Sequence, residues 1–137
     1  MVSTKGRYAL RFMIDLAAHE GSDFVPLKDI AERQDISKKY LEIIVKDLVK
    51  GGLIEGASGK HGGYRLKKSA DKVSVSEVLK LMEGSIAPVA CLADGAEKCP
   101  KRSKCKTVGM WEELYKMESE ILVIKKWIRA SSKFQRG

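Results

Sequence analysis

Three cysteines lie close together in one polar stretch of the 137-residue chain, and the chain has no others. Cys91, Cys99 and Cys105 occupy the segment ACLADGAEKCPKRSKCK, with seven and then five residues between neighbours. Buried structural thiols are usually found singly on the apolar stripe of a helix or strand, and an odd number of cysteines disfavours a framework of disulfides. This cluster therefore indicates metal or redox chemistry.

The spacing of the cysteines favours an iron-sulfur cluster over zinc. Zinc commonly uses pairs of cysteines two to four residues apart, and neither gap fits that pattern. Iron-sulfur clusters are held mostly by thiolates, and the five basic residues against one acidic residue in 97–106 would favour thiolates and offset the charge of a cluster. Two alternatives stay open: the thiols act as metal-free redox sensors, or the basic residues contact DNA phosphates.

The length, charge and hydropathy of the chain limit the classes of protein to which it can belong. The length predicts one compact domain, and the net charge of +8 favours a polyanionic partner. The longest stretch without a charged residue is ten positions, Gly84 to Ala93, whereas a membrane span needs about 20 apolar residues. Because Arg11 and Asp15 interrupt the first apolar run, we expect no secretory signal, no membrane contact and a cytoplasmic location. No catalytic triad, phosphate-binding loop or paired-histidine metal motif is apparent, so we expect no enzyme.

Apolar spacing predicts three helices in the first fifty residues. The first covers about residues 4–19, and the second covers 27–34, just after Pro26. Ser37 can cap the third helix by accepting a hydrogen bond from its first turn. Two short helices joined by a tight turn, the second with a basic outer face, are typical of a helix-turn-helix. The alternative is that these lysines are only the solvated side of an amphipathic helix; the outer face consists of Lys38, Lys39, Glu42, Lys46 and Lys50.

A β-hairpin is predicted directly after the third helix. Residues 53–55 and 64–67 form the expected strands, and residues 57–63 form the tip. Lys60 and His61 at the tip suit phosphates or a minor groove, and the glycines let backbone N–H groups approach another surface, although glycine is also a turn requirement. With a further helix over about 74–83, the predicted fold is mainly α with a small β-wing: a winged helix-turn-helix.

A long helix over about residues 107–130 carries an apolar seam at coiled-coil spacing. A small domain could not cover this seam, so we expect a homodimer with two recognition helices about 34 Å apart, suited to a two-fold operator in double-stranded DNA. The alternative is that the helix packs on its own domain. We therefore divide the chain into a DNA-binding domain (1–84), a cysteine loop (85–106) and a dimerisation helix with a tail (107–137); the seam residues are Met110, Leu114, Met117, Ile121, Ile124 and Ile128.

Several of these motifs, in this order, resemble bacterial winged-helix regulators of the IscR/NsrR type, the Rrf-two family. They are STKGRYALRFMIDLA, LKDIAERQDISKKYLEIIVKDLVKGGLI, SGKHGGYRL and the cysteine loop ahead of MWEEL. The resemblance implies a homodimeric transcription factor, usually a repressor, whose loop cysteines hold a [2Fe-2S] or, in some members, a [4Fe-4S] cluster. By position, Cys91, Cys99 and Cys105 match the cluster ligands. The resemblance and the basic face together give the expected DNA-binding residues: Ser37, Lys38, Lys39, Tyr40, Glu42, Lys46, Gly59, Lys60, His61, Gly62, Gly63 and Tyr64.

The chain departs from that family at the fourth cluster ligand. IscR-like members carry a histidine three residues after the last cysteine, where this chain has Val108. Other members use an acidic residue near the start of the partner's first helix, and the stretch KGRYAL offers only Tyr8. The fourth ligand is thus unassigned, and a cluster with three thiolates should be labile. We expect the cluster to control the order of residues 91–106 and so operator binding, with Glu42 accepting from cytosine N4. A regulator of the same fold that senses thiol oxidation or a sulfur metabolite without a cluster, and an RNA- or protein-interaction module, are the alternatives.

Overall fold

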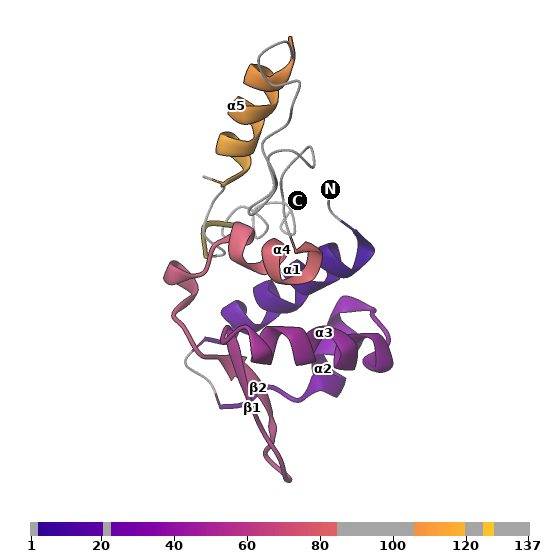
Figure 1. Cartoon of the computed structure of the whole chain (residues 1–137). Coiled ribbons are helices and arrows are strands. Elements are labelled where there is room, and N and C mark those ends of the chain that lie inside the picture. Colours follow the sequence, from indigo (N-terminus) through magenta and orange to yellow (C-terminus); the bar gives the residue numbers. More distant parts are fainter. Residues whose placement is uncertain (1–2, 21–22, 85–105, 120–124, 128–137) are drawn as a thin grey trace, which may run out of the picture.

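The computed structural model describes residues 3–20, 23–84, 106–119 and 125–127 (Figure 1). The described residues form a mainly helical fold with one small antiparallel sheet, as the sequence predicts. The helices and strands predicted within the first 84 residues are confirmed to within one or two residues at each end. In chain order the elements are α1 (Thr4–Ala18), α2 (Leu27–Gln34), α3 (Lys38–Lys50), β1 (Ile54–Ala57), β2 (Gly63–Leu66), a short 3-10 helix (Ala70–Lys72), α4 (Val75–Glu83) and α5 (Val108–Ser119).

Hydroxyl side chains fix where three of the helices begin. Ser3 accepts from the Gly6 N–H at 3.1 Å at the start of α1, and Ser37 accepts from the Tyr40 N–H at 3.1 Å at the start of α3. At α4, Ser74 takes part in a complete capping box. These bonds satisfy N–H groups that have no partner inside a helix. The predicted cap of α3 is therefore confirmed.

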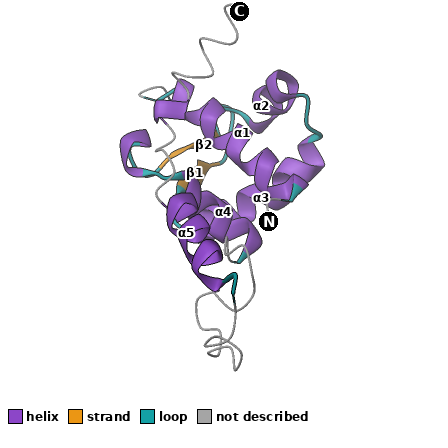
Figure 2. Ribbon diagram, turned by 90° about the horizontal axis from the view of Figure 1, so that it is seen from above, coloured by secondary structure: helices purple, strands orange, loops and turns teal. Residues whose placement is uncertain are grey.

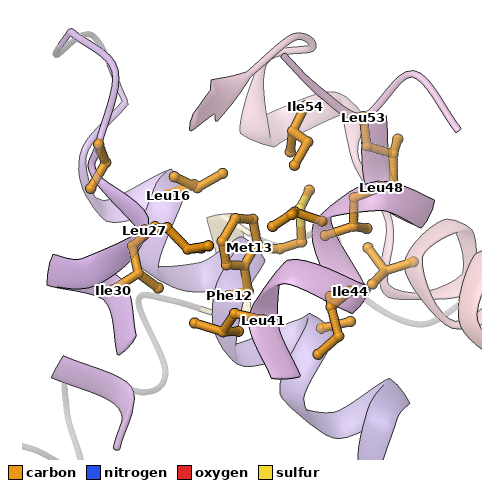
Figure 3. Packing of buried hydrophobic residues seen from close by; sticks show 14 of the residues in the cluster. Phe12, Met13, Leu16, Leu27, Ile30, Leu41, Ile44, Leu48, Leu53 and Ile54 are labelled. Atoms are coloured by element: carbon orange, nitrogen blue, oxygen red, sulfur yellow. The ribbon is translucent and has the colours of Figure 1, made fainter. Parts of the chain in front are cut away.

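The apolar core forms around α1, as Figure 3 shows. Phe12 and Met13 are fully buried there, against Ile30 of α2, Ile44 of α3 and Ile54 of β1. α2 and α3 are joined by a tight turn in which Asp35 adopts a left-handed conformation with φ of 53°. The helix-turn-helix is thus packed on α1 by one continuous core, which fixes the orientation of α3.

The two strands form a hairpin that projects from this core. β1 and β2 pair antiparallel, with Ile54 opposite Leu66 and Ala57 opposite Gly63. Val25, just before α2, also exchanges two backbone hydrogen bonds with Tyr64 of β2, at 2.8 and 2.9 Å. This isolated bridge ties the hairpin to the start of α2, so the wing and the helix-turn-helix are held together.

α4 packs on α1; α5 extends beyond α4 in Figure 1 and overlaps α4 in the view from above in Figure 2. Val75 and Leu79 of α4 form a second apolar cluster that also contains Leu10 of α1 and Tyr115 of α5. Figure 1 places α5 and the wing at opposite ends of the described structure. The long helix predicted over 107–130 is confirmed for 108–119 and 125–127; residues 120–124 and 128–130 lie outside the described residues. In the part of the chain that the structure describes, no helix is long and apolar enough to cross a membrane.

Candidate nucleic-acid interface

A groove of about 540 Å³ runs between the wing and the first turns of α2 and α3. It brings together the start of the predicted recognition helix and the glycine-rich hairpin, which are about twenty residues apart in the sequence. Lys38 and Glu42 face it from α3, one helical turn apart. The residues that line it are Pro26, Leu27, Lys28, Lys38, Glu42, Gly56, Ala57, Ser58, Gly59, Gly62, Gly63 and Tyr64.

The outer face of α3 is charged and has no ion-pair partners within the described residues. Lys38, Lys39, Glu42 and Lys46 are all exposed, while the opposite face of α3 is buried in the core. A solvated surface helix often pairs its lysines with carboxylates on the same helix, but here the only acidic residue on this face also stays unpaired. These side chains are therefore free to meet a ligand.

Two predicted contact residues at the start of α3 have structural roles as well. The Ser37 hydroxyl accepts the capping hydrogen bond from Tyr40, which leaves its own proton available to donate. Tyr40 is half-buried, and its ring meets the Tyr8 ring edge-on, with centroids 5.5 Å apart. Both residues therefore help to position the first turn of α3.

The tip of the wing presents an exposed lysine and histidine above tightly packed glycines. Lys60 and His61 are exposed at the tip. A Cβ at Gly62 would lie 2.4 Å from the Ala57 carbonyl oxygen, and a Cβ at Gly63 would lie 2.2 Å from the Val25 carbonyl oxygen. Close backbone packing accounts for these two glycines. Glycine at both positions is therefore required by the hairpin itself, whether or not the wing binds a ligand.

Tyr64 and Gly59 complete the predicted wing residues. Tyr64 is half-buried against Phe12, with ring centroids 6.3 Å apart, and its backbone pairs with Val25. Gly59 adopts a φ of 101° at the turn, with open space where a side chain would point. Both residues line the groove, and Tyr64 also anchors the wing to the core through its contacts with Phe12 and Val25.

Lys28 is a groove residue that the sequence analysis missed. It is the second residue of α2, it is exposed, and it has no ion-pair partner among the described residues. Helical periodicity could have placed Lys28 on the surface, since it directly follows the buried Leu27 and so points away from the core-facing side of α2. Its position across the groove from the wing, however, depends on the Val25 bridge, which the sequence pattern does not reveal.

A buried ion pair fixes α2 against α1. The Asp15 side chain is 3% exposed and accepts from the Arg33 guanidinium, at 3.0 Å from Nε and 2.7 Å from the terminal nitrogen. The Gln34 amide donates to the same carboxylate at 2.9 Å. Hydrogen bonding to Asp15 raises the pKa of Arg33 above its usual value. Because Asp15 belongs to α1 and both donors belong to α2, the pair sets the angle between these helices.

The start of α1 is held by polar contacts on two sides. Glu83, at the end of α4, accepts from the Ser3 backbone N–H at 2.8 Å and from the Ser3 hydroxyl at 2.5 Å, and these bonds lower the pKa of Glu83. Lys5 of α1 pairs with Asp47 of α3 at 2.6 Å. The first turn of α1 thus connects the end of α4 with the C-terminal part of α3.

The predicted cluster ligands, Cys91, Cys99 and Cys105, lie outside the described residues. Over the described ranges, no group of three or more His, Cys, Asp or Glu side chains could hold a metal ion. Val108, at the position of the IscR-type histidine, is the first residue of α5. His19 follows the end of α1, where its Nδ1 lies 2.8 Å from the Asp15 carbonyl oxygen, so it is a helix-end residue.

The apolar seam of α5 is exposed where the structure describes it. Met110, Leu114 and Met117 have exposed fractions of 56%, 38% and 65%. Tyr115 packs on the other side of α5, against α4 and α1. The remaining seam residues, Ile121, Ile124 and Ile128, lie outside the described residues. The described helix thus uses one side for its own domain and leaves the seam open.

Comparison with known proteins identifies the class to which this architecture belongs. Residues 2–123 match the Rrf2 family model, described as an iron-dependent transcriptional regulator. Protein rrf2 of Nitratidesulfovibrio vulgaris is 39% identical over 115 residues, which cover 84% of this chain and 76% of that protein. The transcriptional regulator IscR of Erwinia tasmaniensis is 39% identical over 121 residues, which cover 88% of this chain and 72% of IscR.

Solved structures of two kinds of regulator resemble the fold over nearly its whole length. CymR, titled the global cysteine regulator of B. subtilis, has a TM-score of 0.78 and 28% identity, with 95% of this chain and 97% of CymR covered. T. potens IscR has a TM-score of 0.75 and 30% identity, with coverage of 98% and 90%. An oxidized form of Staphylococcus aureus CymR has a TM-score of 0.68 and 33% identity, with coverage of 90% and 93%. These similar proteins are regulators and not enzymes. The chain, with its helix-turn-helix and wing, belongs to the Rrf2 family of DNA-binding transcriptional regulators.

Proposed function

We propose that this regulator binds a two-fold operator in double-stranded DNA as a homodimer, with α3 in the major groove and the wing against the neighbouring backbone or minor groove. One observation carries this proposal. The groove beside the wing combines Lys28 and Lys38 with Glu42, and none of these charges is neutralised by another described residue. A recognition helix needs such an open charged face, because its partners are phosphates and base edges. A protein of this kind would act in the cytoplasm.

The charged residues divide into two roles in this complex. The exposed lysines of α2, α3 and the wing tip would contact phosphates and make binding strongly salt-dependent. Glu42 would read sequence, because a carboxylate can accept from the N4 amino group of cytosine. The expected phosphate ligands are Lys28, Lys38, Lys39, Lys46 and Lys60, and Ser37, Tyr40, His61 and the wing residues Gly59, Gly62, Gly63 and Tyr64 would line the same surface.

The dimer would form through the seam of α5. Met110, Leu114 and Met117 repeat every three or four residues and are exposed together, which is the pattern of a helix that pairs with a second copy. A monomeric protein gains nothing from three exposed large apolar side chains on one helix face. Residues 1–84 would then form the DNA-binding unit, and 107–137 the dimerisation segment with its tail.

We further propose that DNA binding is controlled through the cysteine segment, residues 85–106, and that the protein acts as a repressor. Cys91, Cys99 and Cys105 would hold a [2Fe-2S] cluster, or a [4Fe-4S] cluster as in some relatives. Thiolates are the ligands that such clusters prefer, and the family description is iron-dependent. The bound cluster would supply an iron centre whose charge and stability respond to redox conditions. The Val108 side chain has no donor atom, so the fourth ligand stays unassigned.

The second candidate is a regulator that uses the same thiols without a cluster. The similarity to the CymR structures favours it, because one is titled a cysteine regulator and another is an oxidized form. In this version, oxidation of a thiol or binding of a small sulfur compound would change the operator affinity.

Anaerobic purification followed by visible absorption, iron and acid-labile sulfide assays would separate the two versions. Operator binding is then measured with iron-loaded and metal-stripped protein at one ionic strength. A cluster-controlled regulator shows different affinities for the two preparations, whereas a cluster-free one shows no cluster absorption and responds to thiol oxidation. Single Cys-to-Ala variants at positions 91, 99 and 105 identify the thiols that matter. Selection of duplexes from a random pool tests DNA binding itself, since an RNA- or protein-interaction module would recover no two-fold motif.

A further inference from the structure

We propose that Ile43 is a specificity residue that contacts the 5-methyl group of a thymine in the operator. The inference rests on the proposed function, since it assumes that the outer face of α3 meets the major groove. It adds a recognition chemistry that the charged residues of this face cannot supply.

Ile43 lies on the outer face of α3, close to its centre. The helix buries Leu41, Ile44, Val45 and Leu48 on one side. At about 100° per residue, the direction opposite to these four falls at Lys39 and Lys50, with Ile43 on one side and Lys46 on the other. The Ile43 side chain is 52% exposed, although α3 sends its other isoleucine, Ile44, fully into the core.

The charges around Ile43 indicate what covers it. Lys39 and Lys46 lie one helical turn before and one turn after it, and neither has an ion-pair partner in the described structure. Asp47, the acidic residue one turn after Ile43, is already paired with Lys5 at 2.6 Å. An apolar protein partner seated on Ile43 would have to bury both of these charges, which is costly without compensating carboxylates. A DNA major groove offers both kinds of partner. Its phosphates suit the lysines, and the thymine methyl is an apolar group on the base edges.

The position of Ile43 along α3 also agrees with base contact. Residues near the start of a recognition helix reach base edges, and Ile43 is the sixth residue of α3, directly after Glu42. Val49 is exposed to 44% as well, but it is the twelfth residue, at the far end of the helix. The β-branched side chain of isoleucine has few rotamers in a helix, so little conformational freedom is lost when it contacts a methyl group.

Single replacements of thymine by deoxyuridine in the selected operator test this contact, because they remove only the methyl group. We expect one thymine position in each half-site to lower the affinity of the unchanged protein by about four-fold, the equivalent of one buried methyl or methylene. Ile43→Ala should weaken binding to the thymine operator and should lose the difference between thymine and deoxyuridine at that position. Val49→Ala is the matched control, and it should keep the difference.

The outcomes separate the inference from the proposal beneath it. If the protein selects a two-fold duplex but Ile43→Ala stays as sensitive to deoxyuridine as the unchanged protein, Ile43 does not read the methyl and the inference is overturned. The same holds if no thymine position matters. If the unchanged protein selects no duplex at all, the proposed function fails and the inference fails with it. Thermal unfolding of both variants verifies that the helix remains folded.

Discussion

Removing the guanidinium of Arg33 should lower the free energy of unfolding more than removing the charge of any other exposed lysine or arginine named above. Arg33→Met keeps the aliphatic stem but leaves the Asp15 carboxylate, whose side chain is 3% exposed, with the Gln34 amide as its hydrogen-bond donor and His19 Nδ1 at 3.6 Å. Removing one partner of a buried ion pair costs about 3–5 kcal/mol. Because the Arg33 side chain is 40% exposed, water can replace part of the lost interaction. We therefore expect a loss of about 2–3 kcal/mol in the free energy of unfolding.

Urea unfolding followed by far-UV circular dichroism measures this loss, at one protein concentration because dimerisation would change the apparent stability. Lys68→Met is the control, since Lys68 and Glu77 form an exposed pair at 3.5 Å, and it should cost less than about 1 kcal/mol. In an Asp15→Asn background, Arg33→Met should become much less costly, because there is no longer a buried carboxylate that loses its ion-pair partner. If the two changes are additive within about 0.5 kcal/mol, the ion pair does not hold α2 in place and the reasoning is refuted.

Two other contacts give predictions of the same kind. The pKa of Glu83 is lowered by Ser3, so this bond stabilises the folded protein fully above the ordinary glutamate pKa of about 4.3 and is lost as the pH falls through the lower folded value. Glu83→Gln should thus reduce stability at pH 7 and have a smaller effect near pH 3, as urea titrations at the two pH values will show; an equal loss at both values contradicts the assignment. Gly63→Ala should lower the free energy of unfolding by about 2–4 kcal/mol and weaken operator binding, because its Cβ would lie 2.2 Å from the Val25 carbonyl oxygen. Gly59→Ala, where φ is also positive but the space is open, should cost only about 1 kcal/mol. Urea unfolding of both variants measures the difference, and similar losses at the two glycines would argue against close packing as the cause.

Local sequence signals were sufficient to predict most of the described fold. Ser37 caps α3 as expected, and α4 ends at residue 83 as its predicted range has it, because helix ends depend on the hydrogen bonds and conformations of a few neighbouring residues. The Val25 bridge to Tyr64 was not predicted. A single extended residue has no periodicity of its own, and its partner lies 39 positions away in the sequence.

The candidate site was predicted less completely than the fold, for a physical reason. The charged residues of α3 were found, since their face follows from helical periodicity alone. Lys28 was missed, because its place in the groove depends on how α2 and the wing pack in three dimensions. Gly62 and Gly63 were correctly placed in the wing, but sequence alone could not separate a glycine that approaches DNA from one that fits against its own backbone. The cysteine ligands and the second half of the seam stay predictions.

The polar junction at the start of α1 gives this fold a route for mechanical coupling. Glu83 is the last residue of α4, and the cysteine segment begins two positions later. A shift of that carboxylate would pull on Ser3, and Lys5, half a helical turn further on, would carry the shift to Asp47. Because one continuous apolar core holds α3 on α1, such a shift would move the two helices together as one unit.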